Sequence, residues 1–344
     1  MARHRASAVK ASSRSALRSA TEAPDGYRLS EPIVHGNLAI YFVHGTSRGG
    51  PVPLTLQEAL ARKIVEVRET GKVNELEIEN TGDDEIFIQG GDIVKGGKQD
   101  RVLSVSLLVP PHSGRLPVEA YCVEAGRWSP RGAEDAQRFS SADTRLPSRR
   151  AKLELAGAVT GGNAAASGGV GARQQQIWQN VARIQGKLSE NIGAPVAAPR
   201  SQTSLQLSLE NGSLAREQAE YLKALEPRGS EASDIVGYVF AVNGKVNSAD
   251  IYSSNALFRK LWPTLLRASV TEAIGERDAA ADPAPARAAV SDFMTSLNGQ
   301  RTVESAAGKA ATVRKRANAA AVFTETRPAA AAPSAWVHRN FLAR

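Results

Sequence analysis

Alternating apolar and polar positions dominate the chain from residue 27 to residue 128, as in half-buried β-strands. The runs follow one another at short intervals, and turn residues such as Gly71 and Asn80-Thr81-Gly82 separate them. No interval between these runs, apart from residues 54–60, has helical character, which favours antiparallel pairing. The pattern predicts strands over residues 33–43, 64–69, 75–80, 85–89, 101–109 and 116–124.

One short helix interrupts these strands at residues 54–60. Thr55 is a suitable N-cap, and Glu58 stands three residues further on, where its side chain can bond back to the cap. This spacing is the capping-box signature, so we expect a helix of one or two turns there.

Helical periodicity appears in the second half of the chain, with apolar residues every three to four positions. It predicts helices over residues 177–188, 214–225, 254–266 and 286–298. Between the second and third of these, Asn243-Gly244 separates two alternating runs and is the strongest short-range signal for a hairpin. We therefore expect strands over 235–242 and 245–252, and two terminal strands over 320–324 and 335–341.

These elements predict an α+β fold: a predominantly antiparallel β-sandwich or partly closed barrel with helices packed outside. The late hairpin has too few strands to form a sheet of its own, so we expect one domain over residues 27–344. A disordered basic tail is expected at residues 1–26. Residues 129–172, which include a Gly/Ala-rich run, are expected to form a mobile insertion.

The net charge of +8 is concentrated at the start of the chain, where residues 1–20 carry five Lys or Arg residues and no acid. The remaining chain is nearly balanced, so we predict no nucleic-acid partner. No apolar run reaches the roughly 18 residues of a membrane span, and the start lacks a secretory signal, so we predict no membrane partner and a cytoplasmic location. The acid-free start also has the composition of an organellar transit peptide, although the same Ala and Arg bias continues along the chain.

The single cysteine and five scattered histidines leave no spacing typical of a metal site, so none is predicted. The sequence identifies no cofactor.

Two polar clusters flank the predicted hairpin of residues 101–124. They supply the candidate ligand-binding residues Lys98, Gln99, Asp100, Arg101, Arg127 and Trp128. Lys and Arg groups can hold phosphate or carboxylate, and an Arg beside an indole can stack on a planar ligand. In an antiparallel hairpin the residues entering the first strand lie opposite those leaving the second, so we expect Arg101 and Arg127 to meet away from the turn at residues 110–114.

A structural interpretation of the same residues stays open. The first cluster is then a solvated turn in which Arg101 pairs with Asp100 or Asp92, and Trp128 is a packing residue. The run Gly91 to Gln99 is not a nucleotide-binding P-loop, because Gln99 stands where a magnesium-binding hydroxyl is needed and a strand follows.

Candidates for catalysis are weaker. Cys122 is a potential nucleophile if His112, His35 or Arg127 lies beside it, and Asp92, Glu124 and Glu119 are carboxylates near the same strands. The alternative for Cys122 is a small buried apolar residue in its strand.

The segments Gly97-Lys98-Gln99-Asp100-Arg101 and Cys122-Val123-Glu124-Ala125-Gly126-Arg127-Trp128 resemble a bacterial family of unknown function, the ARG-and-rhodanese-phosphatase-superfamily-associated protein domain. The resemblance extends to residues 54–60, residues 176–181 and the Asn243-Gly244 hairpin, and covers the chain from about Tyr27 to its end. The family pattern has Gly-Ala-Lys-Gln-Asn-Arg where this chain has Gly96-Gly97-Lys98-Gln99-Asp100-Arg101, which changes the local charge. The resemblance implies an ADP-ribose-related or nucleotide-related setting.

Two functions follow as hypotheses. The first is a small-molecule-binding or enzymatic domain for a phosphorylated or ADP-ribose-like ligand, held by the two polar clusters. The second is a non-catalytic module that binds a partner protein. In the first case the two clusters converge on one concave pocket, and in the second they lie apart on a convex surface.

Overall fold

The computed structural model describes residues 22–23, 26–132, 134–158, 169–330, 332 and 334–344. The predicted α+β class, with predominantly antiparallel sheets, is confirmed. The largest sheet has ten strands, with β3 (Ile33–His35) paired to β4 off the main path. The order along it is β1 (Glu22–Ala23), β2 (Tyr27–Leu29), β4 (Leu38–His44), β14 (Ile235–Val242), β15 (Lys245–Tyr252), β19 (His338–Ala343), β18 (Ala321–Pro328), β17 (Ala311–Ala317) and β16 (Val303–Ala307).

Two smaller sheets contain the strands from the first half of the chain. The six-stranded sheet has the order β13 (Phe139–Arg145), β9 (Asp92–Gly96), β10 (Arg101–Leu103), β12 (Gly114–Cys122), β7 (Glu75–Asn80) and β6 (Val65–Glu69). The three-stranded sheet joins β11 (Leu107–Val109), β8 (Ile86–Ile88) and β5 (Leu54–Thr55), and its β5–β8 pair is parallel.

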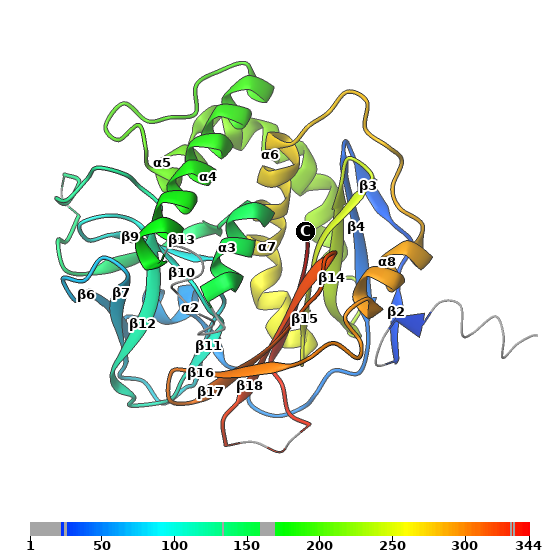
Figure 1. Cartoon of the computed structure of the whole chain (residues 1–344), viewed down its shortest axis with the longest axis horizontal. Coiled ribbons are helices and arrows are strands. Elements are labelled where there is room, and N and C mark those ends of the chain that lie inside the picture. Colours follow the sequence, from blue (N-terminus) through cyan, green and yellow to red (C-terminus); the bar gives the residue numbers. More distant parts are fainter. Residues whose placement is uncertain (1–21, 24–25, 133, 159–168, 331, 333) are drawn as a thin grey trace, which may run out of the picture.

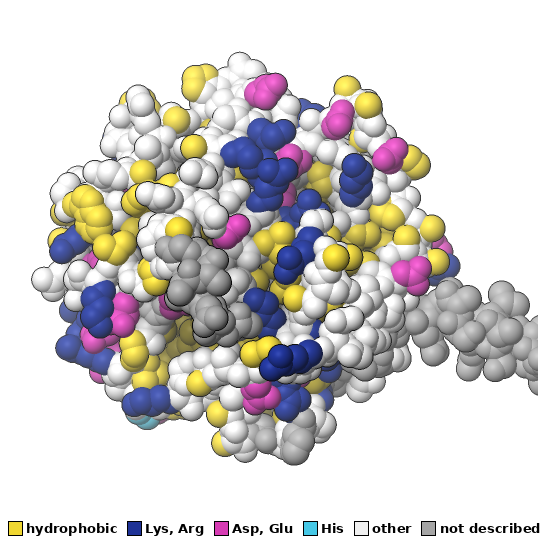
Figure 2. All heavy atoms as spheres, viewed as in Figure 1, with side chains coloured by type: hydrophobic (Ala, Val, Ile, Leu, Met, Phe, Trp, Pro, Cys, Tyr) yellow, Lys and Arg dark blue, Asp and Glu magenta, His cyan; other side chains and the backbone are white. Residues whose placement is uncertain are grey.

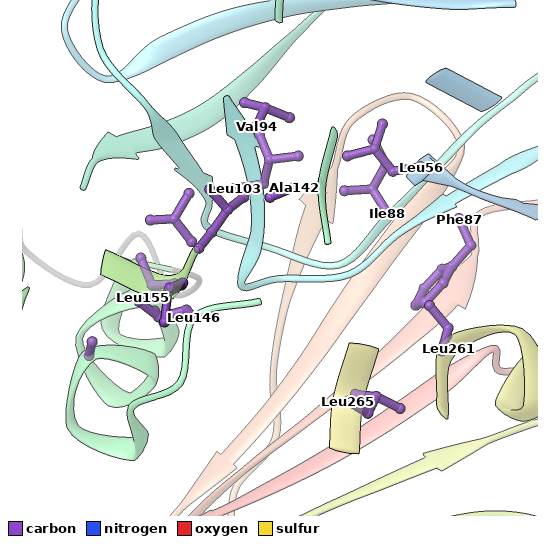
Figure 3. Close-up of a cluster of buried hydrophobic side chains, with 14 of the residues drawn as sticks. Leu56, Phe87, Ile88, Val94, Leu103, Ala142, Leu146, Leu155, Leu261 and Leu265 are labelled. Carbon is purple, nitrogen blue, oxygen red and sulfur yellow. The ribbon is translucent and has the colours of Figure 1, made fainter. Parts of the chain in front are cut away.

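Helix α7 (Asn255–Gly275) connects the layers, because it contacts β13 of the six-stranded sheet and β4, β14 and β15 of the large sheet (Figure 1). Its Trp262 packs edge-on against Phe42 and Tyr238 of the large sheet. Leu261 and Leu265 belong to the same buried cluster as Trp262, and this cluster reaches Phe87 of β8 and Leu155 of helix α3 (Arg149–Ala158) (Figure 3). One continuous core therefore spans all three sheets.

The remaining helices are α2 (Leu56–Ala61), α3 (Arg149–Ala158), α4 (Gly169–Ile192), α5 (Leu205–Leu209), α6 (Gly212–Leu225) and α8 (Arg287–Thr295), with a 3₁₀ turn at Glu226–Ser230. The capping box of α2 is confirmed, since Thr55 and Glu58 exchange both predicted hydrogen bonds. Among the described residues, none of the helices has both the length and the apolar character needed to span a membrane.

The Asn243-Gly244 hairpin is also confirmed: β14 and β15 pair antiparallel around it, with one register shift between Phe240 and Ala241. Both turn residues have positive φ, 51° and 75°, the backbone that a two-residue hairpin turn requires.

The single strand predicted over residues 101–109 is wrong. Residues 101–103 form β10 beside β12, and residues 107–109 form β11 in another sheet, beside β8. Between them the chain leaves the ladder: the Ser106 hydroxyl accepts a hydrogen bond from the Gly90 N–H, and Ser104 bonds to Glu119. Ser104 keeps a backbone hydrogen bond to Glu119 of β12, whereas Ser106 lies between the two sheets.

Residues 129–172, which were expected to form a mobile insertion, contain β13, α3 and the start of α4. Residues 159–168 of the Gly/Ala-rich run lie outside the described residues. Residues 1–21 and 24–25 of the predicted tail also lie outside the described residues. Glu22–Ala23 pair with β2 as a short strand. No element was predicted over residues 303–317, which form β16 and β17.

Candidate functional site

The first polar cluster forms the turn between β9 and β10. Gly97 has a φ of 56°, and a Cβ there would lie 2.4 Å from the Phe139 ring, so the turn requires glycine. Arg101 pairs with Cys122 across the ladder, at the end of the strands away from the Pro110–Gly114 turn. The predicted register is therefore correct at this point.

The two arginines of the prediction are held by separate internal carboxylates. Arg101 is almost fully buried, donates to Gln99 Oε1 at 3.0 Å and lies 3.3 Å from both Glu69 oxygens. Arg127 donates from Nε to Glu124 Oε2 at 2.7 Å and from its other nitrogens to the carbonyls of Gly96 and Gly97. The alternative in which Arg101 pairs with Asp100 or Asp92 is wrong.

Asp100 pairs instead with Arg131, a residue that the sequence analysis did not single out. The two terminal nitrogens of the Arg131 guanidinium donate to the Asp100 carboxylate, at 2.7 and 2.8 Å. One of them, Nη1, also donates to the Ser204 hydroxyl at 3.0 Å. Asp100 and Glu124 have no exposed side-chain surface, and Arg127 lies 3.8 Å from Asp100. We call Asp100, Glu124, Arg127 and Arg131 the buried ion network. It joins the β9–β10 turn to the loop after β12 and to the first residues of α5.

The other residues of the two clusters are at the surface. Lys98 is exposed, and 54% of the Trp128 surface is accessible. The structure thus brings Gln99, Asp100, Arg101 and Arg127 together and leaves Lys98 and Trp128 facing solvent.

The predicted catalytic candidates are also engaged in structural contacts. Cys122 is fully buried, and burial raises the pKa of its thiol to about 11, against a smaller opposing effect of Arg101. His112 bonds to Asp83, and His35 packs on Tyr221. Asp92 is buried, with Oδ1 2.9 Å from Nη1 of Arg145. Glu119 accepts from Ser104 and Tyr121.

A second constellation, formed by residues from distant parts of the chain, lies on the face of the large sheet beneath α3. Asp250 of β15 and His338 of β19 are diagonal neighbours in the ladder, and Oδ1 of Asp250 lies 2.8 Å from Nε2 of His338. Gln89 and Asn340 also donate to this oxygen, each at 3.0 Å. Tyr252 stacks on the imidazole and donates to Gln89, which fixes the arrangement.

The tautomer of His338 follows from its partners. A carboxylate only accepts hydrogen bonds, so Nε2 carries the hydrogen and Nδ1 of the neutral ring is an acceptor. Oγ of Ser106 lies 3.3 Å from Nδ1 and accepts from the Gly90 N–H at 3.0 Å, which leaves its own hydrogen available for the histidine. Ser106, His338 and Asp250 thus form a serine–histidine–aspartate relay.

The relay lines a cavity of about 60 Å³, enclosed by α3, α7, strands of the large sheet and the segment from Ser104 to Ser106. Lys152 and Arg145 line it too. None of the described residues forms an ion pair with the Lys152 ammonium or a side-chain hydrogen bond to it. In Figure 2, Lys and Arg side chains gather near the centre of the face that carries α3 in Figure 1.

Charges in and near the cavity shift one another's protonation. Burial lowers the pKa of Lys152, and the fields of Glu272 and Asp250 only partly offset this effect. Burial opposes ionisation of Asp250, but the hydrogen bond from His338 and the nearby cations outweigh it and lower its pKa. The cavity therefore favours the ionised form of Asp250 and lowers the pKa of the Lys152 amine from its ordinary value.

No sequence motif marks this constellation, because its members lie far apart in the chain. One local signal was present: Ser248, Asp250 and Tyr252 alternate on one face of an interior strand, where a buried polar face is unusual.

In comparisons with known proteins, residues 26–342 match the model of the ARG and Rhodanese-Phosphatase-superfamily-associated Protein domain. No curated protein matches, and no solved structure matches.

Proposed function

Since the chain belongs to the ARG and Rhodanese-Phosphatase-superfamily-associated family, whose description names no reaction, we propose a function from the cavity itself: hydrolysis of an ester bond in a small phosphorylated molecule of the nucleotide or ADP-ribose kind. The observation that carries the proposal is the Ser106–His338–Asp250 relay. A serine hydroxyl is a weak nucleophile unless a base accepts its proton, and here the imidazole and its orienting carboxylate are both in place.

The relay assigns a role to each residue. Oγ of Ser106 attacks the ester carbon while its proton passes to Nδ1 of His338. The same proton then moves to the leaving oxygen as the ester C–O bond breaks. Asp250 holds the ring in the required tautomer and stabilises the imidazolium. Water, activated by His338 in the same way, attacks the acyl-serine and releases Ser106.

Two cations at the cavity suit an anionic substrate. Lys152 is unpaired among the described residues, whereas Arg145 is shared with Asp92 and also donates to the Gly90 carbonyl. An ammonium without an internal partner can bind a substrate phosphate, or the oxyanion that develops during attack.

Diisopropyl fluorophosphate tests the proposal, because it labels activated serines covalently. Peptide mass spectrometry should place the label on Ser106 and find none in Ser106→Ala. Ser104→Ala is the matched control, since Ser104 lines the same cavity but donates to Glu119 instead of His338. In this variant Ser106 should be labelled normally. Labelling elsewhere, or none in the unaltered protein, would reject the proposal.

Ligand binding by Lys98, Gln99, Asp100, Arg101, Arg127 and Trp128 stays a prediction. The internal pairing of both arginines weighs against it, because a ligand would have to displace Glu69 from Arg101 or Glu124 from Arg127. If Ser106 is inert and no small molecule binds, the partner-protein module becomes the better hypothesis.

A further inference from the structure

A second cavity, of about 200 Å³, adjoins the relay cavity at the start of α3. Arg149 and Arg150 of α3 line it, together with Asn247 of β15 and Glu272 of α7. The same three elements supply Lys152, Asp250 and Ala268 to the relay cavity. The two cavities are therefore neighbours along α3.

Two residues that line this second cavity each carry a buried acceptor without a partner. Oδ1 of Asn247 and Oε2 of Glu272 have no hydrogen bond, although their side chains are only 6% and 7% exposed. The opposite ends of both groups are fixed: Asn247 donates to Oε1 of Glu272 at 3.1 Å, and the Arg149 N–H donates to the same oxygen at 2.7 Å. Buried acceptors are costly to leave unsatisfied, so this pair points to a ligand that carries donors.

Unpaired cations stand at the same cavity. Within the described part of the chain, the side chains of Arg149, Arg150 and Lys245 form no hydrogen bond or ion pair, whereas Arg183 is paired with Glu276. Glu276, Asp278 and Asp282 line the cavity as well, so its overall charge is balanced. A balanced cavity with fixed acceptors and free guanidinium groups suits a ligand that has hydroxyls on one part and an anionic group on another.

We propose that this cavity binds the phosphorylated sugar portion of the substrate. The sugar hydroxyls donate to Asn247 Oδ1 and Glu272 Oε2, as ribose hydroxyls commonly do to an acidic side chain. The phosphate is held by Arg149 and Arg150, whose planar donor groups match phosphate oxygens. This inference rests on the proposed function for the identity of the substrate, but the binding itself does not require Ser106 to react.

Calorimetric titration of the full chain with ribose 5-phosphate tests the inference, with ribose and inorganic phosphate as separate probes. Ribose 5-phosphate should bind at least tenfold more tightly than either probe. Arg150→Ala and Glu272→Gln should each weaken its binding roughly tenfold or more, since the first removes a donor to the phosphate and the second replaces an acceptor oxygen with an amide nitrogen that only donates. Arg301→Ala is the control, because Arg301 is exposed and forms no hydrogen bond or ion pair with the described residues.

Two results would overturn the inference: equal affinity for inorganic phosphate and ribose 5-phosphate, or unchanged affinity in both variants while thermal unfolding shows that they are folded. Ser106→Ala separates the two proposals. This variant should bind ribose 5-phosphate normally. If the unaltered protein binds ribose 5-phosphate but Ser106 is not labelled, only the relay is rejected. If Ser106 is labelled but ribose 5-phosphate does not bind, only the proposed role of this cavity is rejected.

Discussion

Asp250 and His338 lie on adjacent interior strands of the ten-stranded sheet, with a carboxylate oxygen 2.8 Å from an imidazole nitrogen and both side chains buried. Three donors converge on that one oxygen, from Gln89, Asn340 and His338. A buried carboxylate with this many donors is stabilised in its ionised form. The pair is therefore built to keep a negative charge behind the imidazole.

Asp250→Asn should change how stability depends on pH. The pKa of Asp250 is lowered in the folded protein, so its ionised form contributes stability above its unfolded pKa of about 3.9, and the contribution is lost as pH falls through the folded value. The stability difference between the unaltered protein and Asp250→Asn should be constant from pH 5 to 7 and shrink below about pH 4. Urea unfolding at several pH values measures it, and a difference that grows on acidification would contradict the assignment.

Arg131→Ala should destabilise the fold by about 3–5 kcal/mol, because it leaves the buried Asp100 carboxylate without its closest cation and removes the second cation near Glu124. Arg138→Ala is the matched control: Arg138 is mostly exposed and lies 3.8 Å from Glu66, so its loss should cost no more than about 1 kcal/mol. Denaturant unfolding compares the two variants. Similar small losses would show that the buried ion network is not what fixes the β9–β10 turn.

Local signals in the sequence predicted local structure well, and the reason is physical. The α2 capping box and the Asn243-Gly244 turn each depend on residues within a few positions of one another. Alternation over residues 101–109 is equally local, but it does not specify the partner strand, and the two halves joined different sheets.

The relay could not be predicted in the same way. Ser106 lies at the break between β10 and β11, Asp250 on β15 and His338 at the start of β19, so only the tertiary fold brings them together. The polar clusters at residues 95–101 and 126–128 were conspicuous because their charged residues are adjacent in the sequence. In the fold, most of those charges pair with oppositely charged side chains from other parts of the chain.

Cys122 should resist thiol reagents in the folded protein. It is fully buried, and a thiol pKa of about 11 leaves very little thiolate at pH 8. Reaction with 5,5′-dithiobis(2-nitrobenzoate) should be complete within minutes in denaturant and negligible over hours without it. Rapid modification of the native protein would return Cys122 to the list of nucleophiles.

The most direct measurement of the central claim is the rate at which diisopropyl fluorophosphate labels Ser106 in the unaltered protein and in His338→Gln. Glutamine has no nitrogen that can take the serine proton, so the rate should fall at least a hundredfold while the melting temperature shows that the variant is folded. Equal rates in the two folded proteins would show that His338 does not activate Ser106, and the proposed relay would be wrong.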